Sequence, residues 1–269
     1  MNRIDAAFAR LKAEKKKAFV AYIGAGDPHL DATPALVAAL ERAGADIIEL
    51  GVPFSDPLAD GVVNQLSAQR ALEAGTTLPK LLDTIAAIRK TSQVPIVLFT
   101  YLNPLLRGAA SAEALETTLR QAREAGADGA LVLDLPVEEG LGAAAFPDAF
   151  RRIQLVAPTT PPARVATIGK AATGFIYYVS REGVTGQQNE VAAGIAEQVA
   201  AIRRHAAAPV CVGFGISNPE QARIVAAQAD GAVVGSALVS KVAEWGREKD
   251  LAARLEAFAR PFAEAIHSA

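Results

Sequence analysis

The sequence predicts a single (β/α)8 barrel, in which eight parallel strands close into a cylinder and helices cover its outside. Three observations favour this fold class. Eight short apolar runs, rich in β-branched residues, recur along the 269-residue chain, and longer amphipathic stretches separate them. Each run is almost wholly apolar, as in strands of a parallel sheet covered by helices. No linker or low-complexity stretch interrupts the series, so we expect residues 1–269 to form one domain.

The strands are expected at the apolar runs, in chain order. They are Phe19–Ile23, Ile47–Leu50, Ile96–Tyr101, Ala130–Leu133, Ile153–Val156, Phe175–Val179, Val210–Val212 and Ala232–Val234. Eight strands with helical crossovers in a chain of this length favour a closed barrel over an open sheet.

Helices are expected between the strands, where Ala, Leu, Arg and Glu are common and apolar positions lie three and four apart. The clearest are Thr33–Arg42, Leu78–Arg89, Ala112–Ala125, Ala192–His205 and Pro219–Ala227. Thr33 is the expected N-cap of the first, with Pro34 at its first helical position. Ile4–Ala13 adds an extra N-terminal helix to the TIM barrel, and Leu251–Ile266 closes the chain. The weakest unit lies between Glu139 and Arg152.

Composition limits the partners and the compartment. The net charge of −2 gives no electrostatic reason to expect nucleic acid or an anionic membrane. The only cysteine, Cys211, excludes an internal disulfide, favours a reducing compartment and is expected to be buried. The first twenty residues lack the apolar stretch of a secretory signal, and no apolar run approaches the ~20 residues that span a bilayer. We expect a cytoplasmic protein.

Acidic residues follow the second predicted strand. Strand parity puts the side chains of Ile47 and Glu49 on one face, so Glu49 faces the barrel interior near its rim if Ile47 does. Partial desolvation there would raise the pKa of the Glu49 carboxyl toward neutrality and suit it to proton transfer. The next loop carries Asp56 and Asp60, and Asp60 could face Glu49 across a ligand. A structural charge at Glu49 and turn-capping aspartates fit the same spacing.

Glycine-containing segments follow the seventh and eighth predicted strands, at Gly213–Ser217 and Gly235–Ala237. In barrel enzymes these loops often bind a phosphate together with the N-terminus of a short helix. Glycines let the backbone approach an anion, and Ser236 adds a hydroxyl donor. A third segment, Gly183–Gly186, follows the sixth strand. We expect a phosphorylated small molecule, although each segment alone also fits an ordinary turn.

The remaining residue types narrow the chemistry. None of His29, His205 and His267 stands at a predicted strand end with another metal-type ligand, which disfavours a metal-dependent aldolase. No lysine stands at the carboxyl end of a predicted strand, which disfavours a Schiff-base enzyme. Gly24–Pro28 lacks the spacing of a dinucleotide-binding loop. A phosphate site with carboxylates remains, and it suits proton transfer on a substrate with its own electron sink.

Motifs spread in order over nearly the whole chain resemble those of the tryptophan synthase α subunits. They are GAGDP at Gly24–Pro28, ELGVPFSDPLADG at Glu49–Gly61, QLSAQRALEAG at Gln65–Gly75, YLNP at Tyr101–Pro104, DLPVEE at Asp134–Glu139, LVAPTTP at Leu155–Pro161, GFIYYVSREGVTG at Gly174–Gly186 and VGFGIS at Val212–Ser217. The resemblance implies a carbon–carbon lyase that splits indole-3-glycerol phosphate into indole and glyceraldehyde 3-phosphate by a retro-aldol reaction.

The resemblance also implies roles for single residues. Glu49 and Asp60 match the catalytic pair: Glu49 would shuttle a proton between the glycerol hydroxyl and C3 of indole, and Asp60 would interact with the indole N–H. The indole pocket falls on Tyr22, Phe99, Tyr101, Leu131, Tyr177, Thr185 and Phe214. The phosphate site falls on Gly186, Gly215, Gly235 and Ser236. The protonated indole is the electron sink, so neither a lysine nor a metal is required.

The family resemblance implies a partner as well. A β subunit that carries pyridoxal phosphate would receive indole through a tunnel and complete an α2β2 heterotetramer, while this chain binds no cofactor. Its contact face would include Pro53–Asp56 and the region of Asn103.

Two segments depart from the family pattern: Val62-Val63-Asn64 replaces the usual Pro-Thr-Ile or similar, and Arg107–Ala114 lacks an aromatic residue. Two alternatives stay open, a stand-alone lyase that releases free indole and a catalytically quiet barrel that activates the β subunit. Retention of both Glu49 and Asp60 argues against the second.

Overall fold

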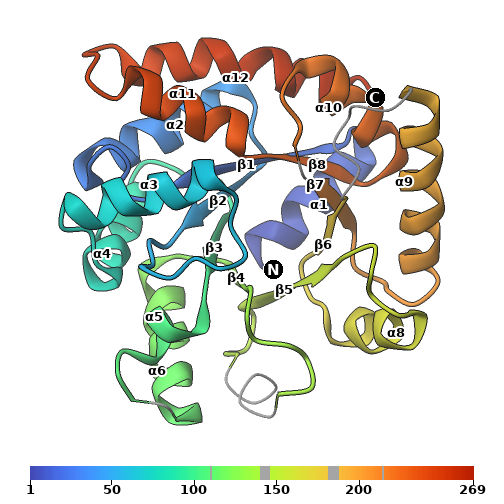
Figure 1. Cartoon of the computed structure of the whole chain (residues 1–269), viewed down its shortest axis with the longest axis horizontal. Helices are drawn as coiled ribbons and strands as arrows, with labels where there is room; N and C mark the ends of the chain where they lie inside the picture. The colour runs from blue at the N-terminus through green and yellow to red at the C-terminus, as the bar shows by residue number, and fades with distance from the viewer. Residues whose placement is uncertain (110, 140–145, 181–187, 214) are drawn as a thin grey trace.

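The computed structural model describes residues 1–109, 111–139, 146–180, 188–213 and 215–269, which form a closed barrel (Figure 1). Neighbouring strands pair in parallel and in sequence order, and Ala18 lies opposite Gly231 where the last strand closes on the first. The strands are β1 (Ala18–Gly24), β2 (Ile47–Gly51), β3 (Ile96–Thr100), β4 (Gly129–Val132), β5 (Arg151–Val156), β6 (Ile176–Val179), β7 (Val210–Gly213) and β8 (Gly231–Val234). All eight predicted strands are confirmed, with small differences at their ends.

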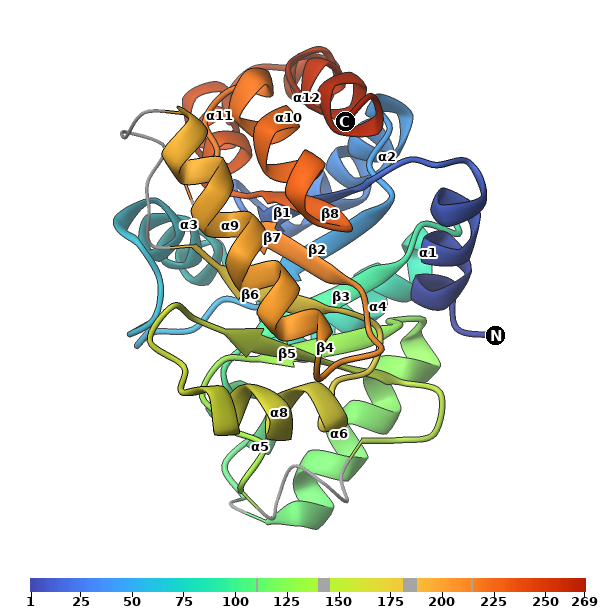
Figure 2. The ribbon, with the colours of Figure 1, turned by 90° about the vertical axis from the view of Figure 1, so that its right-hand side faces the viewer.

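Helices surround the strands (Figure 2). They are α1 (Arg3–Ala13), the 3-10 helix η1 (Leu30–Ala32), α2 (Thr33–Ala43), α3 (Val62–Glu73), α4 (Leu78–Ile88), α5 (Leu102–Leu106), α6 (Ala112–Ala125), α8 (Pro162–Ala171), α9 (Gln188–Arg203), α10 (Pro219–Gln228), α11 (Ser236–Trp245) and α12 (Leu251–His267). The seven helices named from sequence are present, whereas α3, α5, α8 and α11 were not named. None of the helices within these described ranges is long and apolar enough to cross a membrane.

Two sequence expectations about element ends are wrong. Helix α2 begins at Thr33, Ala32 is its N-cap residue, and no side chain caps it. The Thr33 hydroxyl instead accepts the N–H of Gly26 at 3.0 Å, because the loop after β1 folds back onto the helix start. Strand β3 ends at Thr100, and Tyr101 is the N-cap residue of α5. Tyr101 is thereby free to bond the loop after β2.

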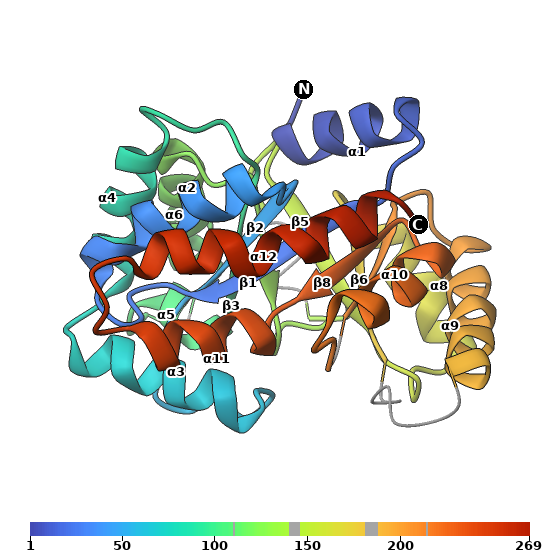
Figure 3. The same cartoon turned by 90° about the horizontal axis from the view of Figure 1, so that it is seen from above.

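The core has two layers. A large outer cluster lies between strands and helices and includes Ile48 and Leu50 of β2. A smaller inner cluster fills the barrel and includes Ile47 of β2 together with Ile4 and Leu11 of α1. Helix α1 therefore closes the amino-terminal end of the barrel, and Figure 3 shows it on the side opposite α3. The interior of the barrel is thus filled at its amino-terminal end by apolar side chains of α1.

Three aspartates precede strands at the closed end and repeat one arrangement. Asp46 accepts the N–H of Phe19, Asp128 that of Ile96, and Asp230 that of Val210, at 2.8–3.0 Å. In each case the carboxylate links its own strand to the preceding one. Each is also paired with arginine: Arg10 with Asp46, Arg3 and Arg89 with Asp128, and Arg203 with Asp230. The charge of each of these three aspartates is therefore matched locally, and the carboxylates stabilise the strand pairing.

Candidate active site

Glu49 is the central acid of the open end. It lies on β2 opposite Tyr22 of β1 and Val97 of β3. Ile47 belongs to the inner cluster, so strand parity directs Glu49 inward too, and its side chain is 0% exposed. Neither carboxyl oxygen has a hydrogen-bond partner among the residues that the structure describes. Burial raises the pKa of the Glu49 carboxyl to about 8, so it holds a proton at neutral pH.

Asp60 stands at the end of the loop after β2, directly before α3, and hydrogen bonds fix it there. Tyr101 donates its hydroxyl to Oδ2 at 2.8 Å and accepts the N–H of Ala59 at 2.9 Å. Gln65 holds the backbone carbonyl of Asp60 at 2.8 Å, and Asn64 Nδ2 lies 3.5 Å from Oδ1. Burial raises the pKa of the Asp60 carboxyl, while the bonds from Tyr101 and Asn64 oppose that shift. Asp60 is thus held by donors that Glu49 lacks.

A cavity of about 270 Å³ lies at this end of the barrel. Seven residues predicted from sequence line it: Tyr22, Glu49, Phe99, Tyr177, Gly215, Gly235 and Ser236. Six lining residues were not predicted: Gly61, Val62, Val63, Asn64, Ile216 and Val233. Asp60 and Tyr101 line a smaller adjoining cavity that shares Tyr22, Asn64 and Phe99 with the first. The two acids therefore flank one composite site.

Aromatic side chains form one wall of this site. The rings of Tyr22 and Phe99 meet edge to face, with centroids 5.0 Å apart. The Tyr22 hydroxyl lies over Gly51, where an added Cβ would come within 2.3 Å of it, and the Tyr177 hydroxyl lies over Gly213 at 2.4 Å. The two strand-end glycines therefore make room for the phenols. Burial, followed by the nearby Asp60 and Glu49 carboxyl groups, raises the pKa of Tyr22 far above its usual range.

An adjoining wall of the site offers backbone donors. Gly235 is the N-cap residue of α11 and Ser236 is its first residue. The first N–H groups of a helix have no partner inside it and favour an anion. Gly215 has a φ of +70°, and the space that its Cβ would occupy is open. The cavity therefore combines a helix N-terminus, a hydroxyl and a left-handed glycine, and Gly235 lies directly beside Tyr22, where an added Cβ would come within 3.4 Å.

Some predicted site residues are not in the cavity lining. Leu131 is 1% exposed and belongs to the inner core cluster with Ile47 and Val97. Cys211 is fully buried in that cluster, as expected. Thr185, Gly186 and Phe214 lie outside the described residues. The unpredicted Asn64 follows Asp60 closely, and the departure of Val62-Val63-Asn64 from the family pattern is the signal that marks it.

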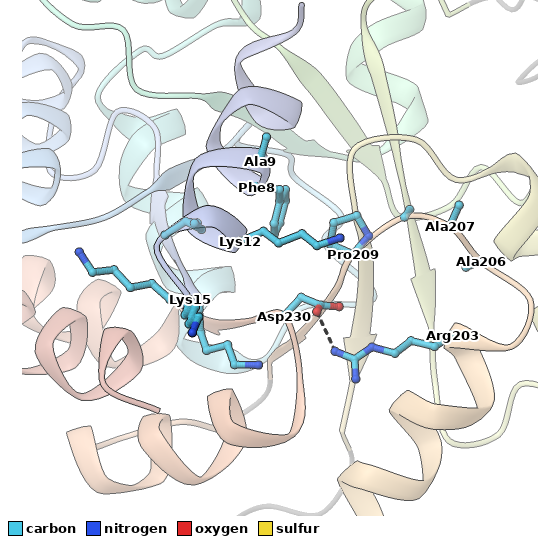
Figure 4. A pocket seen from close by; sticks show the side chains of 13 residues that line it. Phe8, Ala9, Lys12, Lys15, Arg203, Ala206, Ala207, Pro209 and Asp230 are labelled. Atoms are coloured by element: carbon cyan, nitrogen blue, oxygen red, sulfur yellow. Dashed lines mark hydrogen bonds and ion pairs between the residues drawn. The ribbon is translucent and has the colours of Figure 1, made fainter.

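A larger hollow of about 610 Å³ lies at the closed end, beside α1 (Figure 4). Its cationic lining consists of Lys12, Lys15, Lys16, Lys17 and Arg203. Several of these charges are engaged: Arg203 bonds Asp230 at 2.7 Å, Lys17 donates to the carbonyl of Ala229, and Lys16 pairs with Glu14. This hollow therefore differs from the cavity around Glu49, whose carboxyl group has no partner among the described residues.

Comparison with known proteins identifies the family. The family model for the tryptophan synthase alpha chain matches residues 8–267. The chain belongs to the tryptophan synthase alpha chain family. A tryptophan synthase alpha chain from Opitutus terrae is 53% identical over 96% of this chain and 97% of its own length. One from Geobacter sulfurreducens is 51% identical over 92% and 95%.

Solved structures agree with this membership. The alpha subunit from Legionella pneumophila is 37% identical, with a TM-score of 0.88 over 99% of this chain and 98% of that one. A tryptophan synthase chain from Mycobacterium tuberculosis, in an aminoacrylate-bound form, is 32% identical with a TM-score of 0.85 over 99% and 100%. Tryptophan synthase alpha chains act in tryptophan synthesis and catalyse the cleavage of indole-3-glycerol phosphate, a lyase reaction.

Proposed function

We propose that Glu49 is the proton shuttle of this cleavage. The bond that breaks joins C3 of indole to the first carbon of the glycerol chain. Protonated Glu49 gives its proton to C3, and the resulting carboxylate takes the hydroxyl proton as the aldehyde of glyceraldehyde 3-phosphate forms. The electron pair of the broken bond returns to the indole ring, so Glu49 ends as it began. Its pKa of about 8 and its lack of described partners support both halves of this cycle.

Asp60 acts on the ring nitrogen in this proposal. Protonation of C3 places positive charge on the indole N–H, and a carboxylate beside it stabilises that charge. The bonds from Tyr101 and Asn64 favour the ionised form of Asp60, which this role requires. The different settings of the two acids thus suit a proton donor and an electrostatic stabiliser.

The substrate's remaining parts fit the two walls of the site. The flat indole ring packs against Tyr22, Phe99 and Tyr177, which bury it without adding charge. The phosphate binds the N-terminus of α11 through Gly235 and Ser236, together with Gly215. The family resemblance adds Thr185, Gly186 and Phe214 to the two subsites, while Leu131 supports the indole subsite from the inner core cluster.

A β subunit is the proposed partner, in an α2β2 assembly in the cytoplasm. The related Mycobacterium tuberculosis structure carries the name tryptophan synthase in an aminoacrylate-bound form. In this chain Leu58, two residues after the segment Pro53–Asp56, is 93% exposed, and such an apolar side chain suits a protein interface. The β subunit consumes the indole and holds the pyridoxal phosphate that its reaction needs, whereas this chain needs no cofactor of its own.

One observation carries this proposal: Glu49 lines the cavity, and its buried carboxyl has no partner within the described part of the chain. The experiment incubates the purified chain with indole-3-glycerol phosphate and measures released indole, with and without a β subunit and serine. We expect slow release alone and faster release with the partner. A rate unmoved by saturating partner would indicate a stand-alone lyase, and partner activation without cleavage would indicate a purely regulatory barrel.

A further inference from the structure

Asn64 lies between the cavity around Glu49 and the smaller cavity beside Asp60. It is in the first turn of α3, where its N–H bonds the carbonyl of Gly61 at 3.0 Å. Its side chain lines both the cavity around Glu49 and the smaller cavity beside Asp60. Figure 3 shows α3 at the open end of the barrel, opposite α1. Asn64 is therefore positioned to touch a ligand that spans the two acids.

The amide of Asn64 is only half used. Its Nδ2 lies 3.5 Å from Asp60 Oδ1, at the outer limit of a hydrogen bond. Its Oδ1 is buried and has no partner among the described residues. Exchanging the two amide atoms would set one oxygen against another, so Asp60 fixes the orientation. Because a buried acceptor without a donor costs free energy, the site is better satisfied when a ligand supplies that donor.

The substrate offers three donors of hydrogen bonds. The proposed function assigns the ring N–H to Asp60 and the reacting hydroxyl to Glu49, which leaves the second glycerol hydroxyl. Asn64 lines the same cavity, and its Oδ1 is a buried acceptor without a partner among the described residues. We propose that Asn64 is a specificity-determining residue that accepts a hydrogen bond from a glycerol hydroxyl of the substrate. This inference rests on the proposed function and adds a contact that discriminates the hydroxylated chain from a plain alkyl chain.

The role has a chemical consequence for selectivity. A site that bonds a substrate hydroxyl rejects an analogue that lacks it, because the polar group of the site is then left unpaired. The chain should therefore bind indole-3-glycerol phosphate more tightly than indole carrying a propyl phosphate without hydroxyls. Asn64 should account for about tenfold of that preference, the usual size of one hydrogen bond with its desolvation.

The test compares wild type with Asn64→Leu, which keeps the branched shape of the side chain and removes both polar atoms. Binding of indole-3-glycerol phosphate and of the hydroxyl-free propyl phosphate is measured by calorimetry, and kcat and KM for cleavage are measured with indole-3-glycerol phosphate, the only one of the two that can be cleaved. Asn64→Ala serves as a second variant if Asn64→Leu folds poorly. Gln69→Leu is the matched control, because Gln69 lies on the same helix, is exposed and bonds only Glu73 among the residues described.

We expect Asn64→Leu and Asn64→Ala to weaken binding of the glycerol compound about tenfold more than binding of the propyl compound, because any change at Asp60 affects the ring N–H that both ligands share. Equal losses for both ligands would mean a structural role, and no loss for either would remove Asn64 from recognition. Both results overturn the proposal. If the wild type fails to cleave, the proposed function is wrong, while the binding comparison still decides the role of Asn64.

Discussion

Asp128 and Glu49 are both buried carboxyl groups of the barrel, yet their surroundings are opposite. Asp128, 4% exposed at the closed end, accepts bonds from Arg3, Arg89 and the N–H of Ile96. Glu49, 0% exposed at the open end, has no partner among the described residues. A buried charge is tolerated only when it is paired, so Glu49 relieves the penalty by keeping its proton.

The difference separates stability from function within one barrel. At the closed end every carboxylate of the repeated arrangement joins two strands and an arginine. At the open end the acids face a cavity, and their unused bonding capacity is available to a ligand. Barrel enzymes in general use the amino-terminal face for stability and the carboxyl-end face for chemistry. Substitutions at the closed end should therefore reduce stability, and substitutions at the open end should reduce activity or binding.

Glu49→Gln should give the largest effect, which is a loss of cleavage activity without a loss of stability. The amide cannot carry a proton between the hydroxyl and C3, so we expect cleavage to fall by roughly a thousandfold. Because the amide closely matches the protonated acid, the folded state and the affinity for glycerol 3-phosphate should be unchanged. Steady-state indole release and calorimetry measure the two quantities. Turnover within tenfold of wild type would take Glu49 out of the mechanism.

Asp128→Ala, at the closed end of the barrel, should lower the stability of the folded state. It leaves Arg89, whose side chain is only 10% exposed, without its carboxylate, and it frees the N–H of Ile96. Loss of one partner of a buried pair costs about 3–5 kcal/mol, so urea unfolding should reveal a drop of that order. Activity per folded molecule should be retained. Asp83→Ala, at an exposed position of α4, is the control and should change stability by less than about 0.5 kcal/mol.

Gly235→Asp sharpens the comparison because it should reduce binding without reducing stability. Aspartate is a favourable N-cap residue for α11, yet its charge and bulk occupy the proposed phosphate position. We expect affinity for glycerol 3-phosphate to fall at least about tenfold, equivalent to ~1.4 kcal/mol. Gly235→Ala separates bulk from charge, since its Cβ would lie 3.4 Å from Tyr22, an acceptable contact. Unchanged affinity in the aspartate variant would contradict the phosphate site.

Tyr101→Phe should give the smallest effect, and it should change the rate through the pKa of Asp60. The hydroxyl joins the N–H of Ala59 to Asp60, and its hydrogen bond opposes the raised pKa of that carboxyl. Its removal should raise the pKa of Asp60 further. Because the ionised form is required, the acidic limb of the pH–rate profile should move to higher pH, with a several-fold loss of kcat/KM at neutral pH. A pH–rate profile identical to that of wild type would show that the Tyr101 hydroxyl does not favour the ionised form of Asp60.

Much of this architecture follows from sequence patterns, and the exceptions have physical causes. The strands were predictable because buried parallel strands are continuous apolar runs. Parity put Glu49 on the same face as Ile47, and the place of Ile47 in the inner cluster then directs both inward. Helix α3 was not, since Val62 and Leu66 are exposed and its apolar face is weak. Unless α3 is predicted, the sequence does not indicate that the Asn64 side chain lies beside the Asp60 carboxylate. Thr33 illustrates a further limit, because its hydroxyl bonds a distant loop instead of its own helix.

The protonation of Glu49 tests the central claim most directly. Wild type and Glu49→Gln, both labelled with carbon-13 at glutamate carboxyl groups, would be titrated by NMR, and the signal missing from the variant assigned to Glu49. The account predicts a pKa near 8, so that the carboxyl is protonated at neutral pH. A midpoint near the ordinary value of 4.5 would mean that Glu49 is solvated or paired, and would contradict the proposed proton shuttle.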